Sequence, residues 1–335
     1  MGSLFRNRVP LTPRRMAVVL GLLLVILLAV GAVGISVGSV RIPASRIAGI
    51  LAGGGSGETD RTIIVGIRLP RLLLAMVVGA GLSVAGLVFQ ALLRNPLAEP
   101  YILGVSSGGT VGTLLALGLS LGVLGTPLAS FAGSALVMVL VYAVAQRRGQ
   151  IDTNALLMAG VMIGAFFNAI VLLIIAVMHQ ELRNAFLWLM GNLSGATMSS
   201  LTVVGPIVVI ATIALFWQAK SYNAIATGDE SALQLGVNVK RIKRVSYLLA
   251  SLITGLVVSV SGVVGFVGLI IPHVCRMLLG PDHRLLLPAS VLLGASFMML
   301  ADLLSRTLLA PVEIPVGAVT AAIGAPLFIY LLRKT

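Results

Sequence analysis

Apolar runs of roughly 20 residues alternate with short polar segments along nearly the whole chain. Because a helix of that length spans the hydrocarbon core of a bilayer, the pattern predicts about ten transmembrane helices. We expect them at residues 16–37, 68–93, 101–119, 124–145, 154–178, 201–217, 245–264, 265–280, 286–304 and 316–332. The eighth should be short and broken, since Gly268, Pro272 and His273 interrupt its apolar residues. The expected fold is therefore an all-α polytopic membrane protein with a single transmembrane domain over residues 1–335.

The composition agrees with this interpretation, because 58% of the 335 residues are hydrophobic and only 10% are charged. A soluble domain carries about 25% charged residues. In a soluble protein, the formal net charge of +13 would suggest nucleic acid as a partner. Here the basic residues lie between apolar runs, where they orient a membrane protein with its basic loops in the cytoplasm. We therefore expect no nucleic-acid partner.

Basic residues at both ends predict that both termini lie in the cytoplasm. They are Arg6, Arg8, Arg14 and Arg15 before the first span, and Arg333 and Lys334 after the last. The first run is long enough to span and lacks a clear small-residue cleavage site, so we interpret it as a transmembrane helix rather than a signal peptide. Three arginines oppose the charge rule, because the loop at residues 38–62 falls outside in this topology: Arg41, Arg46 and Arg61.

The second span, at residues 68–93, is dense in small residues, which include Gly79, Gly81, Ser83 and Gly86. Small side chains let helix backbones approach closely in a membrane, where lipid gives helices no hydrophobic reason to associate. We therefore expect this helix to be central. The segment NPLAEP at residues 95–100 should then break the chain at the inner surface.

The longest polar stretch between the apolar runs is GDESALQLGVNVKRIKR, residues 228–244. Acidic and amide side chains alternate with leucines in its first half, and its second half holds a basic cluster of Lys240, Arg241, Lys243 and Arg244. This pattern predicts a short amphipathic helix that ends in the basic cluster. The topology places the whole segment 219–244 in the cytoplasm.

Two segments of the chain resemble each other weakly. AGLSVAGLVFQALLRNP at residues 80–96 aligns with LVVSVSGVVGFVGLIIP at residues 256–272, so that the two glycines Gly86 and Gly262 precede Pro96 and Pro272 by the same interval. If the unit repeats after five spans, the second copy must be inverted in the membrane. The alignment therefore predicts inverted repeats at residues 65–180 and 245–333, an architecture of transporters.

The sequence lacks the motifs of an enzyme or a metal site. GVSSG at residues 104–108 has the spacing of a hydrolase nucleophile elbow around Ser106, but it opens an apolar helix and lacks a convincing base. His179, His273 and His283 lie apart without ligand spacing, and Cys275 is the single cysteine. No phosphate-binding GxxxxGK[ST] motif occurs. We expect no catalytic residue, metal or cofactor in this chain, so ATP-driven transport would need ATP and Mg in a partner.

Charged residues near the last spans offer a rival interpretation. Asp302 and Arg306 stand at positions i and i+4, which predicts an ion pair, and Glu313 follows in the next loop. Inverted repeats also occur in secondary transporters driven by an ion gradient, which need an ionisable site near the middle of the membrane. Asp302, toward one end of its span, is the one candidate for such a site.

Four stretches of the chain carry further motifs: RLPRLLLAMVVGAGLSVAGLVFQALLRNPLAEPYILGVSSGG, ATGDESALQLGV, GFVGLIIPHVCRMLLGPDHRLLLPAS and EIPVGAVTAAIGAPLFIYLL. In this order they resemble the permease subunits of importers for iron chelates, haem and cobalamin, the FecCD and BtuC-like group. The resemblance covers about residues 65–332. It implies the ten-helix permease fold of type II ABC importers in a bacterial inner membrane, surrounded by membrane lipid.

The resemblance also implies an assembly. Two copies of the permease would form a homodimer with the substrate path at its axis. Two ATP-binding cassette subunits would hydrolyse ATP below the membrane, and a periplasmic substrate-binding protein would dock above. The cargo would be an iron-siderophore, haem or cobalamin complex.

Four groups of residues acquire roles through the resemblance. The ATPase would contact a coupling group of Gly228, Asp229, Glu230, Ser231, Ala232, Gln234, Leu235 and Gly236. The binding protein would dock on Arg68, Arg71 and Arg306, although the first two could instead anchor helix ends and Asp302 could claim the third. Thr153 and Asn154 match a cytoplasmic gate, and helix capping explains them equally well. Met158, Met162 and Phe166 would line the pathway, although the two methionines could instead be plain core.

Overall fold

Helices form nearly all of the regular structure in the computed structural model, which describes residues 11–38, 42–52, 57–147, 150–177, 186 and 188–334. The helices up to the middle of the chain are α1 (Pro13–Ser36), α2 (Ala44–Leu51), α3 (Glu58–Arg61), the π-helix η1 (Thr62–Arg68), α4 (Leu69–Leu93), the 3-10 helix η2 (Pro100–Leu103), α5 (Val105–Gly118), α6 (Gly122–Ala145) and α7 (Thr153–Val177). Those after it are α9 (Met198–Phe216), α10 (Ala219–Ala226), α11 (Asp229–Gln234), α12 (Val239–Ser261), α13 (Val267–Leu279), α14 (His283–Thr307) and α15 (Val316–Lys334). Among the sequence-predicted features, Arg6, Arg8, Arg41 and His179 lie outside the described residues.

The strands of the described chain are the pair β1 (Gln146–Arg147) and β2 (Gln150–Ile151), which join α6 to α7. They are antiparallel, with Gln146 opposite Ile151. At two residues each, they make a tight connection between helices rather than a sheet that could form a core.

Seven helices in the described chain are long and apolar enough to cross a membrane. Three further apolar helices, α5, α13 and the part of α15 up to Leu331, are shorter. Since a helix rises about 1.5 Å per residue and the hydrocarbon core is about 30 Å thick, α5 and α13, with 14 and 13 residues, do not reach across it by themselves. The all-α class is confirmed, and each predicted apolar run corresponds to a helix, but the number of ten spans is not established by helix length.

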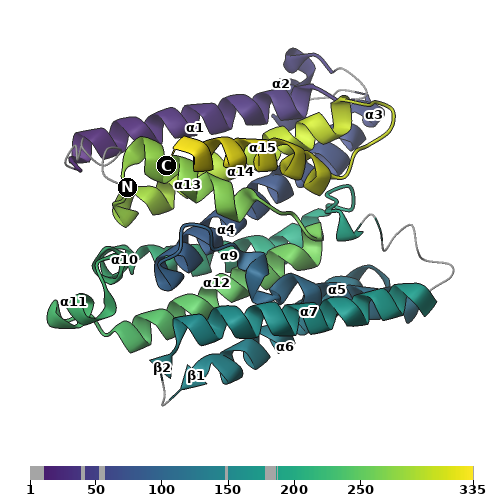
Figure 1. Ribbon diagram of the computed structural model, residues 1–335. Coiled ribbons are helices and arrows are strands. Elements are labelled where there is room, and N and C mark those ends of the chain that lie inside the picture. The colour runs from purple at the N-terminus through teal and green to yellow at the C-terminus, as the bar shows by residue number, and fades with distance from the viewer. Residues whose placement is uncertain are drawn as a thin grey trace.

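Helix α4 lies at the centre of the molecule, as its small residues predict (Figure 1). It packs between one group formed by α1, α13, α14 and α15 and another formed by α5, α6, α7, α9 and α12. A Cβ atom added at Gly86 would lie 1.9 Å from the Gly268 carbonyl oxygen, and one at Gly79 would lie 2.1 Å from that of Gly294. Glycine is therefore required where α4 touches α13 and α14.

The break after α12 lies earlier than expected. Helix α12 ends at Ser261, and α13 then runs through Gly268, Pro272 and His273 without interruption. Pro272 is tolerated because the carbonyl oxygen it leaves without a backbone donor, on Gly268, accepts a hydrogen bond of 3.4 Å from Gln90 Nε2 of α4. Between the helices, the Phe266 amide donates to Glu99 at 2.7 Å, which fixes the turn against the segment before η2.

The two prolines aligned in the weak internal repeat occupy different places. Pro96 lies in the turn after α4, whereas Pro272 lies inside α13. What the two regions share is the succession of a long helix and a short one, α4 with α5 and α12 with α13. A similarity of elements is therefore visible where the residue alignment does not match helix ends.

Candidate functional site

The polar stretch 228–244 folds as two helices rather than one. Asp229 and Glu230 form the first turn of α11, where carboxylates favour the helix dipole. Gly228 and Gly236 have φ of +127° and +80°, which turn the chain before and after this short helix. The Asn238 side chain then accepts from the Arg241 amide at 3.0 Å and caps α12. The predicted short helix is confirmed, but the basic cluster opens α12 instead of ending α11.

Most of the predicted coupling group is exposed, but Gly228 and Asp229 are only partly exposed and Ala232 is buried. Leu235 is 71% exposed, and Glu230, Ser231, Gln234 and Gly236 are exposed beside it. Ala232 is buried against Ile225 of α10 and Val239 of α12, so it seats α11 on its neighbours and offers no surface to a partner. Leu233 is 59% exposed and was not in the predicted set, although its position in the amphipathic pattern could have indicated it.

Helix α10 attaches this segment to α12. The Tyr222 hydroxyl lies 2.7 Å from the Ser246 hydroxyl, which donates to Gln218 Oε1 at 2.9 Å. Tyr222 is fully buried. The cytoplasmic segment predicted at 219–244 is thus held by buried hydrogen bonds, so α10 and α12 should move together.

Asn223 of α10 connects the same segment to the turn between α13 and α14. Its amide nitrogen donates to Asp282 Oδ1 at 2.8 Å, and its amide oxygen accepts from the His283 backbone at 2.9 Å. Hydrogen bonds from Arg284 and from Asn223 lower the pKa of Asp282 to about 2, although partial burial opposes the shift. The carboxylate therefore stays ionised at neutral pH and keeps accepting from Asn223.

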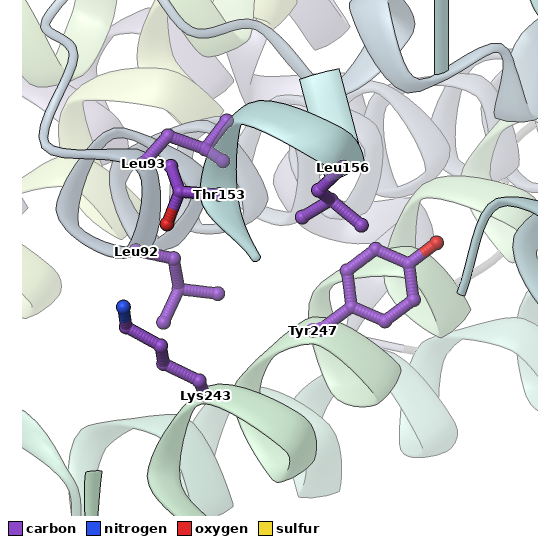
Figure 2. A pocket seen from close by; sticks show the side chains of 6 residues that line it. All are labelled: Leu92, Leu93, Thr153, Leu156, Lys243 and Tyr247. Carbon is purple, nitrogen blue, oxygen red and sulfur yellow. The ribbon is translucent and has the colours of Figure 1, made fainter. Parts of the chain in front are cut away.

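The predicted gate residues stand at the start of α7. The Asp152 carboxylate accepts from the Ala155 amide at 2.9 Å, so Asp152 provides the helix cap and the capping explanation for Thr153 and Asn154 is wrong. Thr153 lines a cavity of about 10 Å³ together with Leu92, Leu93, Leu156, Lys243 and Tyr247 (Figure 2). Asn154 is exposed beside it.

The three predicted pathway residues share one exposed face of α7. Met158, Met162 and Phe166 are 66%, 65% and 64% exposed in the single chain. The opposite face, which includes Gly160 and Phe167, is buried. The plain-core alternative is therefore wrong for the two methionines, and the role of all three side chains in a pathway stays a prediction.

The side chains of the predicted docking arginines, Arg68, Arg71 and Arg306, are largely buried. Arg71 Nε donates to Asp302 at 2.7 Å, and its Nη1 donates to Glu313 at 2.8 Å. Arg306 Nε lies 3.0 Å from Asp302, which confirms the predicted ion pair. Asp302 is 1% exposed, whereas the Glu313 side chain is 48% exposed. We call Arg71, Asp302, Arg306 and Glu313 the arginine–carboxylate network.

Two of the predicted docking arginines, Arg68 and Arg306, also bind the C-terminal end of α1. Arg68 Nη1 donates to the carbonyl oxygens of Ile35 and Ser36 at 2.8 and 3.2 Å, and Arg306 Nη2 donates to that of Gly34 at 3.2 Å. The last carbonyls of a helix lack partners within it, and cations are favoured there. The helix-anchoring alternative therefore has direct support, while docking of a partner on these residues stays a prediction.

The hydrolase motif does not have the required structure. Ser106 lies in the first turn of α5 and is preceded by the 3-10 helix η2, where a nucleophile elbow needs a strand. In the part of the chain that the structure describes, no group of three or more His, Cys, Asp and Glu side chains is arranged to hold a metal ion.

Long apolar helices around a central small-residue helix, together with one exposed polar segment, define a polytopic membrane protein of the transporter class. The chain belongs to the FecCD transport family, whose profile matches residues 22–334. It is similar to the cobalamin import system permease protein BtuC of Halobacterium salinarum, at 43% identity over 83% of this chain and 75% of the relative. It is also similar to the hemin transport system permease protein HmuU of Yersinia pestis, at 41% identity over 81% and 83%.

The fold likewise has a solved counterpart. An inward-facing ABC transporter assigned to the metal-chelate type matches with a TM-score of 0.85 and 30% identity, over 95% of this chain and 99% of the other. PsaBC from Streptococcus pneumoniae in complex with Fab matches at 16% identity with a TM-score of 0.58, which extends the likeness of fold only.

Proposed function

We propose that this chain is the transmembrane permease subunit of an ATP-driven importer that carries an iron-siderophore, haem or cobalamin complex across the bacterial inner membrane. One observation carries the proposal: the coupling group forms an exposed short helix, α11, fastened to the transmembrane helices through α10 and α12. The related permeases named for cobalamin and hemin support this class of cargo.

The permease acts within a larger assembly. A second copy of the chain completes a homodimer, two ATP-binding cassette subunits receive α11 and use ATP and Mg, and a periplasmic binding protein delivers the cargo. The chain crosses the membrane ten times as inverted repeats, in the type II importer arrangement, with both termini in the cytoplasm. The short helices α5 and α13, each following a long helix, support this arrangement, as does the start of α1, which lies at the same end of the molecule as α10 and α11 (Figure 1).

The predicted sites act at three levels. ATP binding and hydrolysis in the partner move α11, and the movement opens or closes a gate at Thr153 and Asn154. Met158, Met162 and Phe166 line the path, where apolar and flexible side chains would not hold a large cargo. Arg68, Arg71 and Arg306 receive carboxylates of the binding protein. Exchange of Glu313 for a partner carboxylate would allow Arg71 to serve both its own network and docking.

The rival ion-gradient transporter is less well supported. Its candidate ionisable group, Asp302, already pairs with both Arg71 and Arg306.

Reconstitution tests the proposal directly. The chain would be placed in proteoliposomes with its cassette ATPase and binding protein, and uptake of labelled cobalamin, haem and a ferric hydroxamate would be measured with ATP inside. A partner ATPase with its phosphate-binding lysine replaced is the matched control. We expect uptake only with the active ATPase, and uptake that persists with the inactive one would contradict the proposal. Titration of the binding protein with the same three compounds identifies the cargo.

A further inference from the structure

One member of the basic cluster differs from the others in its surroundings. Lys240, Arg241 and Arg244 are exposed, whereas the Lys243 side chain is only 8% exposed. Its Nζ lies 2.5 Å from Asp229 Oδ2, at the start of α11. Lysine is almost never buried without a partner, so the ion pair explains why this cation turns inward. The pair joins the exposed coupling helix directly to α12.

The same lysine reaches the predicted gate. Lys243 lines the small cavity together with Thr153 and Leu156 of α7 and with Leu92 and Leu93 of α4. In Figure 2, its ammonium group lies toward the Thr153 side of the cavity, while the Tyr247 hydroxyl points away, toward the Met138 carbonyl oxygen that accepts its hydrogen bond at 3.0 Å. The Lys243 side chain therefore contacts α11 through its ammonium group and lines the same cavity as Thr153 at the start of α7.

The pair is not a fully satisfied structural contact. Asp229 Oδ1 is buried and has no hydrogen-bond partner, although its Oδ2 is bound to Lys243. Buried carboxylate oxygens are nearly always hydrogen-bonded, and an unpaired one carries a cost that needs an explanation. A contact that is remade during a conformational cycle would leave such an atom in one of its states. Packed interiors transmit small displacements because they deform little.

We propose that the Asp229–Lys243 ion pair is the positioning element that transmits movement of α11 to the start of α7 at Thr153. The inference rests on the proposed function, because α11 must be moved by an ATPase. When α11 shifts, Asp229 draws Lys243 with it, and Lys243 changes the space in which Thr153 packs. The exposed cations of the basic cluster take no part in this transmission.

The experiment uses the complete transporter with its ATPase and reads the gate rather than transport. Asn154→Cys reports access to the gate through its rate of reaction with a membrane-impermeant maleimide, and Cys275 can remain because it is buried. Labelling is measured with and without ATP and vanadate. Lys243→Met should retain the ATPase subunit and its hydrolysis, yet lose the nucleotide-dependent change in labelling rate. Lys240→Met, at an exposed position of the same cluster, should behave as the parent protein.

The charge-swapped protein Asp229→Lys/Lys243→Asp should regain the nucleotide response, which a role in folding alone would not predict. The inference is overturned if assembled Lys243→Met responds to nucleotide as the parent does. If Lys243→Met does not assemble, Lys243→Gln and the charge swap decide: an assembled swap without response overturns it too. A parent protein that assembles but shows no response overturns the proposed function itself, and the inference with it.

Discussion

The two charged regions of this membrane protein are built in opposite ways. The arginine–carboxylate network is mostly buried, with Asp302 shared between Arg71 and Arg306. The coupling segment pairs the buried Lys243 with the partly exposed Asp229, and it leaves its remaining charges and two leucines exposed. Charges that pair within the chain lock its helices together, whereas exposed charges remain available to another protein. The difference separates an internal fastening from a docking surface.

The comparison makes Asp302→Ala the most damaging change. Both arginines would keep their positive charges in a buried site without their common carboxylate, and loss of one partner of a buried pair costs about 3–5 kcal/mol. We expect a large fall in the melting temperature of the purified protein in detergent. Asp60→Ala is the control, because the Arg46–Asp60 pair is more exposed and should contribute about 1 kcal/mol or less. An equal fall in melting temperature for the two variants would mean that the network does not hold the helices together.

Leu235→Asp attacks the other side of the comparison. Full burial of an exposed leucine side chain in a partner surface is worth about 1.5–3 kcal/mol, so we expect roughly tenfold or greater weakening of ATPase association. Co-purification and titration of the ATPase would measure it. The melting temperature of the permease alone should not change. Leu121→Asp is the control, since this leucine is 51% exposed in the turn between α5 and α6 and should leave the association unchanged.

Glu313→Gln sharpens the boundary between fastening and docking. Glu313 is the half-exposed member of the network, and its loss should cost about 1 kcal/mol of stability, far less than the loss of Asp302. It also frees the Arg71 donor that a binding-protein carboxylate would use, so affinity for the binding protein should rise. Surface plasmon resonance with the immobilised permease would measure that affinity. Unchanged or weaker docking would argue that Arg71 only stabilises the chain.

Asp282→Asn is the smallest of the expected effects. Because the folded-state pKa of Asp282 is lowered from 3.8 to about 2, its contribution is complete above about pH 4 and is lost as the pH falls through about 2. The Asp282 side chain is partly exposed, at 28%, so solvent screens its interactions and we expect a loss of at most about 1 kcal/mol. Thermal melts of both proteins should therefore differ by the same amount at pH 8 and pH 5. A difference that shrinks toward pH 5 would contradict the lowered pKa.

Local patterns in the sequence predicted what local physics determines. The apolar runs indicated the helices, the glycines of 68–93 indicated the central helix, and the spacing of Asp302 and Arg306 indicated their pair. The sequence could not indicate that Arg71 would meet Asp302, 231 residues away, because only tertiary packing brings them together. For the same reason the basic cluster looked uniform, although burial sets Lys243 apart.

The resemblance to a family supplied partners and roles, but not the burial of individual side chains. It included Ala232 among the coupling residues, although this side chain is buried and packs α11 against α10 and α12. It also named Thr153 and Asn154 without distinguishing them from a helix cap, and only the position of the Asp152 carboxylate settles that question. Side-chain orientation is decided by neighbouring helices, which a motif does not describe.

Pro272 makes one helix depend on another for its own backbone. Because Pro272 has no amide hydrogen, the Gly268 carbonyl oxygen accepts a hydrogen bond from Gln90 Nε2 instead. The side-chain oxygen of Gln90 in turn accepts from Arg276 Nη2 at 2.9 Å, one turn further along α13. Hydrocarbon offers no water as a substitute donor. Pro272 and Gln90 therefore depend on each other. Loss of Gln90 should destabilise the protein less when Pro272 is also replaced by alanine. A residue that usually breaks helices here creates a hydrogen bond that joins α4 to α13.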